Sequence, residues 1–366
     1  MTFFHGIKVT TETTIRPLPH SSGTVLGLVV LPEKEQKTEE PKLQLVQSFG
    51  DLEALSGKAK EYVKAVYQQT RCKIVLLHIS KPAEIEQLKF AEQKLGVTPN
   101  ILLCPILHEK QEKVSDNMKP ILSVLKTVSN SLKAVYIVDL LEKPTSSPKE
   151  MCERGIACWP PVLVSGDTNE KGELTTKSFP LSPFLAGVIA KNDSERGFHT
   201  SFSNREIQGI LGLSADVDHS YFDSGCMSNQ LNECKVVTVI PGPFRVWGNS
   251  GVFPEGKDAY KFVSVLRTED QIQKLLVKGL QWAIDKNITR NFFEEVEVFV
   301  NNLLQTLRRD GVITNGEAWI NKEKTTKEEI TNGRVHISVK WTPSYIAQEI
   351  LITQTLTDEF IKEILK

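Results

Sequence analysis

The sequence predicts an α/β fold whose mostly parallel sheet is flanked by helices. Two observations carry this prediction. Apolar runs without polar alternation recur between residues 24 and 140, and they read TVLGLVVLP, CKIVLLHI, NILLCPIL and KAVYIVDL. Segments with helical periodicity separate these runs. Strands that are apolar throughout are buried on both faces, which is typical of a parallel sheet covered by helices.

The helices of this first domain follow from the spacing of apolar residues. DLEALSGKAKEYVKAVYQQT places Leu52, Leu55, Ala59, Val63 and Val66 on one side of a helix. Further helices are expected over residues 84–95 and 117–132. ERGIACWPPVLV predicts one more strand. The α/β domain is therefore predicted to span residues 24–211.

Residues 182–210 begin as a buried helix and then turn abruptly polar. Phe184, Leu185, Val188 and Ile189 fall at helical spacing, and a crowd of charged and amide side chains follows them. This dense polarity is compatible with an active site, a buried knot of salt bridges or a subunit contact.

A smaller α+β domain is predicted over residues 212–342. VVTVIPG and YKFVSVL are expected as strands, with the glycine-rich loop FRVWGNSGVFPEGKD between them. Thr268 is expected to cap the following helix, with Gln271 reaching back as in a capping box.

A second helix of this domain is expected to start near Asn291 and to end before Gly311. RVHISVKW alternates strictly and predicts a half-buried strand. The predicted buried stripe of the second helix consists of Val296, Phe299, Leu303 and Leu307.

Both ends of the chain are predicted to be extended arms, spanning residues 1–23 and 343–366. VTTETTI and EILITQTL are β-prone, and Thr357 is expected to cap a short terminal helix. Such arms suit strand donation to the sheet of a neighbouring molecule, although they could equally complete sheets of their own chain. The candidate inter-subunit residues are Val9, Thr11, Ile15, Ile350, Ile352 and Leu356.

Composition argues against several classes of function. Lys plus Arg number 44 and Asp plus Glu number 45, so bulk charge predicts no nucleic-acid binding. The six cysteines form no CxxC pair, which favours free thiols in a reducing compartment. No signal peptide or membrane-spanning run is recognisable, so a soluble protein made in the cytoplasm, without membrane insertion, is expected.

The motifs predict no catalytic residue, no cofactor and no metal site. Gly251, Gly256 and Lys257 approach a phosphate-binding loop, but Asp258 follows where the motif needs Ser or Thr. The alternative is a cytosolic α/β enzyme. Its site would lie near Asp139, at a strand end where open α/β sheets bind ligands.

The stretch SPFLAGVIAKNDSERGFHTSFSN resembles a hallmark of contractile tail sheath proteins of bacteriophages and R-type pyocins. Five further segments are similar to blocks of that family. They are FHGIKVTT, VLGLVVLP, FRVWGNSG, the helix pair around QWAIDKNITRNFFEEVEVFVNNLLQTLRRDGVI, and the C-terminal WTPSYIAQEILITQTLTDEFIKEIL. These blocks run from Phe4 to Leu365 in the family's order. Phe202 and Ser250 depart from the family's usual residues, as does His199. The residues that carry the motif are Ala186, Gly187, Asp193, Arg196, Gly197, Asn204, Arg245, Trp247, Gly248 and Asn249.

The resemblance implies a structural protein. Sheath subunits form six-membered rings stacked helically around an inner tube, and terminal arms insert strands into neighbouring subunits. Contraction triggered at a baseplate drives the tube through a cell envelope. The implied partners are the chain itself, the tube, the baseplate and the tail terminator, and the implied location is a virion tail or phage-tail-like particle. A baseplate or cap component that stops at one ring remains a further alternative.

The resemblance also suggests roles for charged residues. Arg196 is expected to pair with Asp193 and Glu195 and to fix a turn beneath the sheet. The C-terminal domain is implied to lie near the axis and to dock a helix on the tube. Candidate tube contacts are Arg308, Arg309, Lys322, Lys324 and Lys327, although each also suits an ordinary solvated face.

Overall fold

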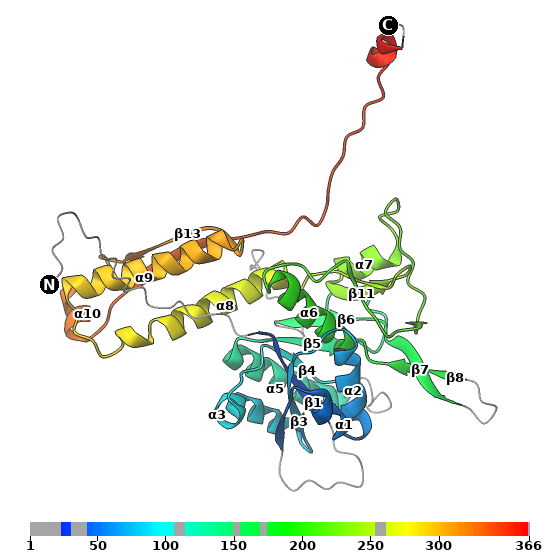
Figure 1. Cartoon of the computed structure of the whole chain (residues 1–366), viewed down its shortest axis with the longest axis horizontal. Coiled ribbons are helices and arrows are strands. Elements are labelled where there is room, and N and C mark those ends of the chain that lie inside the picture. The colour runs from blue at the N-terminus through cyan, green and yellow to red at the C-terminus, as the bar shows by residue number, and fades with distance from the viewer. Residues whose placement is uncertain are drawn as a thin grey trace, which may run out of the picture.

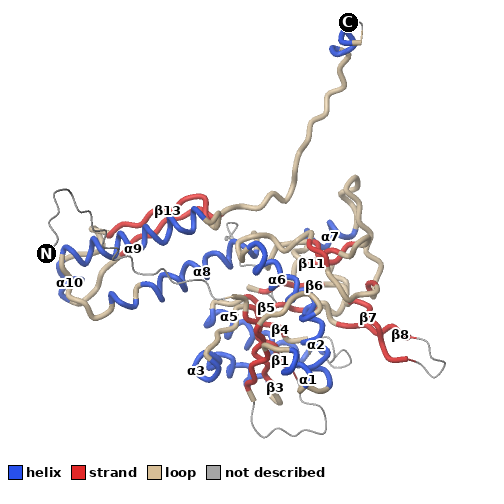
Figure 2. Tube along the Cα trace, viewed as in Figure 1, coloured by secondary structure: helices blue, strands red, loops and turns tan. Residues whose placement is uncertain are grey.

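The computed structural model describes residues 23–30, 42–105, 114–148, 154–168, 174–252 and 261–364. Within these residues the largest sheet has nine strands in the order β2-β3-β1-β4-β5-β6-β11-β12-β9. The six strands from β3 to β11 run parallel, which confirms the predicted parallel sheet (Figures 1 and 2). The strands are β1 Val25–Val30, β2 Leu43–Val46, β3 Lys73–His78, β4 Ile101–Leu103, β5 Val135–Asp139, β6 Gly155–Cys158, β9 Arg205–Glu206, β11 Val236–Ile240 and β12 Arg245–Trp247.

Helices cover both faces of this sheet because successive strand residues point to opposite sides. Leu26 and Leu28 of β1 face one apolar core, and Val25 and Val29 face the other. The first core is covered by α1 Phe49–Glu53, α2 Gly57–Tyr67 and α6 Ser182–Arg196. The second is covered by η1 Pro82–Phe90, α3 Ala91–Leu95 and α5 Val114–Leu132, with α7 Met227–Glu233 also contributing.

Several predicted elements are divided in the structure. The helix expected over residues 51–70 is α1 followed by α2, and the helix expected over 84–95 is η1 followed by α3. ERGIACWPPVLV forms two strands, because Pro160 and Pro161 lack the N–H groups that a continuous ladder needs. The second of them, β7 Val162–Thr168, forms a separate three-stranded sheet with β8 Leu174–Phe179 and β10 Gly212–Leu213.

The expected boundary at residues 211/212 falls inside the α/β unit. β11 pairs in parallel with β6, and β12 continues the same sheet, although its residues were expected to form a loop.

The strand predicted at YKFVSVL is wrong. From Val263 this stretch is the first turn of α8 Val263–Gly279, and its residues 263–266 are all buried. A helical turn that is buried on every side is apolar throughout and shows no helical periodicity. Its sequence therefore resembles that of a buried strand. Thr268 lies inside α8 and donates to the Ser264 carbonyl at 2.8 Å, so it caps nothing.

An elongated layer of helices and strands extends from the α/β unit (Figure 1). α8 leads outward, and α9 Arg290–Arg309 returns beside it after η4 Gln281–Ala283. The predicted stripe of α9 is buried, packed on the antiparallel pair β13 Ile313–Ile320 and β14 Ile337–Pro343. α10 Lys327–Thr331 lies between these strands in sequence, and an extended segment then leads to η5 Glu359–Glu363 (Figure 2).

We predict that Gly187→Ala destabilises the protein. A Cβ at Gly187 of α6 would lie 2.8 Å from both the Val66 carbonyl oxygen and Gln69 Cγ on α2. Relief of this overlap must shift backbone, so the free energy of unfolding should fall by about 1–3 kcal/mol in urea denaturation. Gly50→Ala is the control, since its Cβ would meet Ser48 Oγ at an ordinary 3.6 Å. Equal effects of both substitutions would contradict the close approach of α2 and α6.

Candidate functional site

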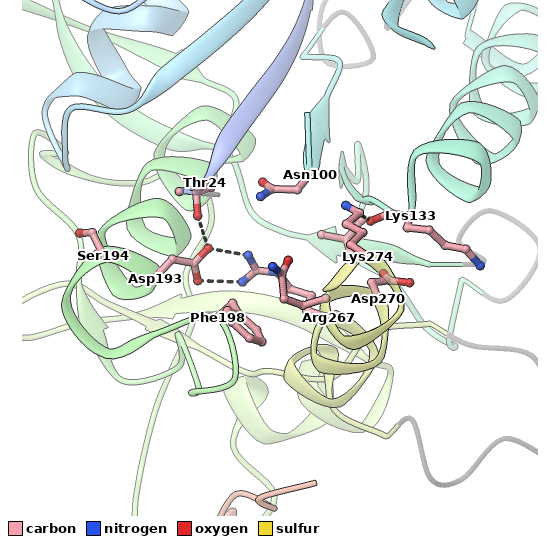
Figure 3. A pocket seen from close by; sticks show the side chains of 12 residues that line it. Thr24, Asn100, Lys133, Asp193, Ser194, Phe198, Arg267, Asp270 and Lys274 are labelled. Carbon is pink, nitrogen blue, oxygen red and sulfur yellow. Dashed lines mark hydrogen bonds and ion pairs between the residues drawn. The ribbon is translucent and has the colours of Figure 1, made fainter. Parts of the chain in front are cut away.

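A buried charged junction joins the α/β unit to α8 (Figure 3). Arg267, in the second turn of α8, donates to both carboxylate oxygens of Asp193 near the end of α6, at 2.8 and 2.5 Å. The two side chains are only 8% and 6% exposed. The Thr24 hydroxyl donates to the same carboxylate. Three segments, the start of β1, the end of α6 and the start of α8, therefore meet at one carboxylate.

A second buried ion pair lies one turn further along α8. Asp270 accepts from Arg154, whose Nε also donates to the Ala134 carbonyl at 3.1 Å. Burial raises the pKa of Asp270, and the nearby Arg154 counters this effect only in part. Lys274 donates to the Lys133 carbonyl at 2.9 Å, and burial lowers the pKa of its ammonium group. The first pair thus fastens α8 to α6, and the second fastens it to the segments beside β5 and β6.

A cavity of about 100 Å³ lies between these groups. Figure 3 shows Asn100 and Phe198 at its walls beside the charged side chains. The carboxylates of the junction are engaged by arginines, so they are poorly placed to act as general bases. Among the described residues no three His, Cys, Asp or Glu side chains form a metal-binding group. The junction therefore consists of buried ion pairs that hold α8 against the α/β unit.

The partners of the charged segment differ from those expected. Arg196 is exposed, and Asp193 pairs with Arg267 instead. Glu195 lies 3.7 Å from Arg205, not beside Arg196. Gly197 has φ +95°, and a Cβ there would lie 2.8 Å from the His199 ring, so glycine is needed for this turn. Sequence spacing could not reveal Arg267, because it lies 74 residues from Asp193.

The structure brings the two motif blocks together on adjacent strands. Arg245 of β12 pairs in register with Glu206 of β9, and its Nη1 donates to Asn204 Oδ1 at 3.3 Å. Gly248 adopts φ +114° and donates its N–H to Ser203 Oγ at 2.9 Å. The carbonyl of the buried Asn249 accepts from the N–H of Val263, the first residue of α8. This motif therefore fixes where α8 leaves the sheet.

Two further motif residues serve packing. Ala186, with Gly187, lies in the fully buried part of α6. The Trp247 ring packs edge-on against His219, with centroids 4.8 Å apart. No nucleophile or acid–base pair is formed by these contacts.

Asp139 has a structural role at the start of α6. Its carboxylate accepts from the Ser182 N–H at 2.9 Å and from the Ser182 hydroxyl at 2.5 Å. Cys158 Sγ lies 3.4 Å from the same carboxylate, and Asp139 is 3% exposed. A negative charge at a helix N-terminus is stabilising. This buried position gives a substrate no access to Asp139, so it argues against the enzyme alternative.

Comparisons with known proteins point to one group of proteins. Residues 255–357 match the family model of the phage tail sheath C-terminal domain. The major tail sheath protein of Serratia phage KSP20 is 24% identical over 98% of this chain and 96% of its own length. The tail sheath protein of Escherichia phage P2 is 27% identical over 74% of this chain and 66% of its own length.

The chain is a relative of contractile tail sheath proteins.

The fold agrees with this relationship. The contracted helical sheath of the anti-feeding prophage has a TM-score of 0.76 and 17% identity, covering 98% of this chain and 100% of that one. The contracted sheath of an extracellular contractile injection system, PVC, gives a TM-score of 0.71 with 98% and 99% covered. The predicted resemblance is thus confirmed. None of the helices in the described ranges is long and apolar enough to cross a membrane.

The terminal arms of this sheath relative are only partly described. Val9, Thr11 and Ile15 lie outside the described residues. Ile350, Ile352 and Leu356 belong to an extended segment and are 77%, 82% and 98% exposed. Within the described residues EILITQTL forms no strand, contrary to its β-prone sequence, because no described sheet edge pairs with it. In the terminal turn, Thr357 Oγ1 accepts from the Glu359 N–H at 3.2 Å.

The five candidate tube contacts do not form one patch. Arg308 and Arg309 are at the C-terminal end of α9, where Arg309 pairs with Asp310 at 3.3 Å. Lys322, Lys324 and Lys327 follow β13, at the other end of the α9–β13 layer. A 20-residue helix is about 30 Å long, so a single small contact cannot include both groups. The two groups stay separate candidates.

We predict that Arg267→Met strongly destabilises the chain, because it leaves the buried Asp193 carboxylate without its cation. The expected loss in the free energy of unfolding is about 3–5 kcal/mol, measured by urea denaturation of dilute protein. The double variant D193L/R267M should recover much of this loss, because no buried charge is left unpaired. Arg290→Met is the control, since Arg290 is 92% exposed in its pair with Glu294, and it should change stability by less than about 0.5 kcal/mol. A small effect of Arg267→Met would contradict the junction as described.

Proposed function

We propose that this chain is the structural protomer of a contractile tail sheath. Protomers stack as six-membered rings around an inner tube, and the sheath shortens to drive the tube through a cell envelope. The proposal is supported by the relationship to sheath proteins over nearly the whole chain. Its partners are copies of itself, the inner tube, and baseplate and terminator proteins at the sheath ends. It acts in a virion tail or phage-tail-like particle assembled in the bacterial cytoplasm.

The observation that carries the proposal is the exposed C-terminal arm. Ile350, Ile352 and Leu356 lie on one side of an extended, β-prone segment, Leu351 on the other is 85% exposed, and no described residue of the chain pairs with the segment. Leaving this much apolar surface in water is unfavourable, so the segment needs a partner. Strand addition to another molecule's sheet supplies one.

The β13–β14 pair is a suitable acceptor for such a strand. Its register runs from Ile313 opposite Pro343 to Ile320 opposite Ile337, and each strand pairs only with the other among the described residues. Each strand therefore presents a free edge that can accept one arm strand. One arm strand forms a few main-chain hydrogen bonds, each contributing about 0.5–1.5 kcal/mol. Two arms per protomer make the contacts multivalent, so weak single joints give a strong lattice.

This arrangement also separates rigid from flexible parts. The buried pairs at Asp193 and Asp270 hold α8 to the sheet, so the α9–β13–β14 layer follows the α/β unit as one piece. The extended segment after Ser344 is exposed over most of its length. During contraction the rigid parts change their mutual packing while the arms keep neighbours connected.

We predict that the arms are required for polymerisation. Intact protein at high concentration should form long tubes in negative-stain electron microscopy. Three variants should form no tubes, because each weakens one contact of the lattice. They are the deletion of residues 1–20, the deletion of residues 346–366 and the triple variant I350N/I352N/L356N. Val277→Asn is the matched control, since Val277 of α8 is 70% exposed but lies outside the arms. Tubes from both deletion variants would contradict arm-mediated assembly.

A further inference from the structure

An apolar groove lies where the first half of α9 meets the end of β13 and α10. It has a volume of about 470 Å³. Phe293 and Val298 line it from α9, Ile320 from β13 and Ile330 from α10. Val298 is 58% exposed and Ile330 37%. No part of the chain that the structure describes covers this groove, although it is far more apolar than the junction cavity.

The terminal turn η5 is an apolar element without a core. Phe360, Ile361 and Ile364 are 64%, 56% and 84% exposed. In a 3₁₀ turn residues i and i+3 lie on the same side, so Ile361 and Ile364 form one apolar face, and Phe360 flanks it a third of a turn away. The groove and this face are both apolar, and neither is covered by the described residues.

We infer that the groove binds residues 357–364 of a second copy of this chain. The inference rests on the proposed function, because strand donation is what brings the second copy there. It adds a side-chain anchor to the main-chain pairing of the arm.

Strand direction supports this occupant. β14 starts opposite Ile320, at the groove, and ends at Pro343, away from it. An arm that pairs antiparallel to β14 therefore runs toward the groove. After such a strand over about residues 349–356, η5 arrives at the groove mouth. Since β14 has seven residues, a strand of this length matches its free edge.

The course of the arm argues for a second copy. The arm leaves its own chain beside Gly311, where the Ser344 hydroxyl donates to the Gly311 carbonyl at 2.7 Å. It then runs away from the α9–β13 layer (Figure 1). An extended segment of fifteen residues spans up to about 50 Å, which suffices to reach a neighbouring molecule.

Charge at the rim agrees with this occupant. Within the groove lining, Glu294 pairs with Arg290, and Glu297 accepts from the Ile320 N–H at 3.3 Å. Lys322 remains as the exposed cation of the rim. The incoming turn carries Asp358 and Glu359 at its start. A lysine expected to contact the tube thus has an alternative partner in the arm of a neighbour.

Cysteine cross-linking tests the inference. A tagged copy carrying Val298→Cys is mixed with an untagged copy carrying Ile361→Cys, assembled, and oxidised. The expected result is a heterodimer band on non-reducing gels, at least tenfold stronger than from either single variant alone. The matched control pair, Val277→Cys with Ile361→Cys, should give no such band. Tubes without the heterodimer band would overturn the groove assignment and leave the proposed function intact.

The double variant V298C/I361C distinguishes binding of the arm to its own groove from binding to the groove of a second copy. Oxidised dilute protein should stay uncross-linked, and a closed monomer that migrates faster on the gel would show that the arm folds onto its own groove. That result would overturn the second-copy inference. Absence of both tubes and heterodimer would contradict the proposed function and the groove assignment together. Phe360→Ser should halve the heterodimer yield or reduce it further, because it removes the largest exposed apolar side chain of the turn.

Discussion

The contact between Asp193 and Arg267 is the constraint on which the arrangement of this molecule depends. One carboxylate holds the start of β1, the end of α6 and the start of α8. A buried pair of this kind adds little net stability compared with apolar residues, but it is costly to break. Its value here is positional, since it fixes the direction in which α8 leaves the sheet. The second pair, Arg154 with Asp270, fixes the same helix one turn later.

The proposed sheath role needs such a fixed direction. α8 joins the α9–β13–β14 layer to the α/β unit, so in the proposed lattice it would carry force from one to the other. A loosely attached helix would let the layer swing, and lattice contacts would then not move the rest of the subunit. These ties lie at the start of the helix, where the Asn249 carbonyl accepts from the Val263 N–H, well before the exposed C-terminal segment.

Sequence patterns predicted the elements of the fold better than their arrangement. Continuous apolar runs identified β1, β3, β4 and β5, because strands buried on both faces must be apolar throughout. The position of β11 beside β6 was not predictable, since strand order depends on packing between distant segments. The first turn of α8 was mistaken for a strand because its surroundings bury every side of it. Most motif residues lie at contacts among α6, β9, β12 and α8, but the partner of Asp193 could not be inferred from local spacing.

The central claim is that free protomers become a sheath through strands donated to β13–β14 of their neighbours. A helical reconstruction of the polymer by electron cryomicroscopy tests it most directly. We expect residues 350–356 of a neighbouring copy to pair along the free edge of β14, which makes β14 an inner strand of a larger sheet. A polymer in which both edges of β13–β14 remain unpaired, with residues 350–356 packed elsewhere, would contradict it.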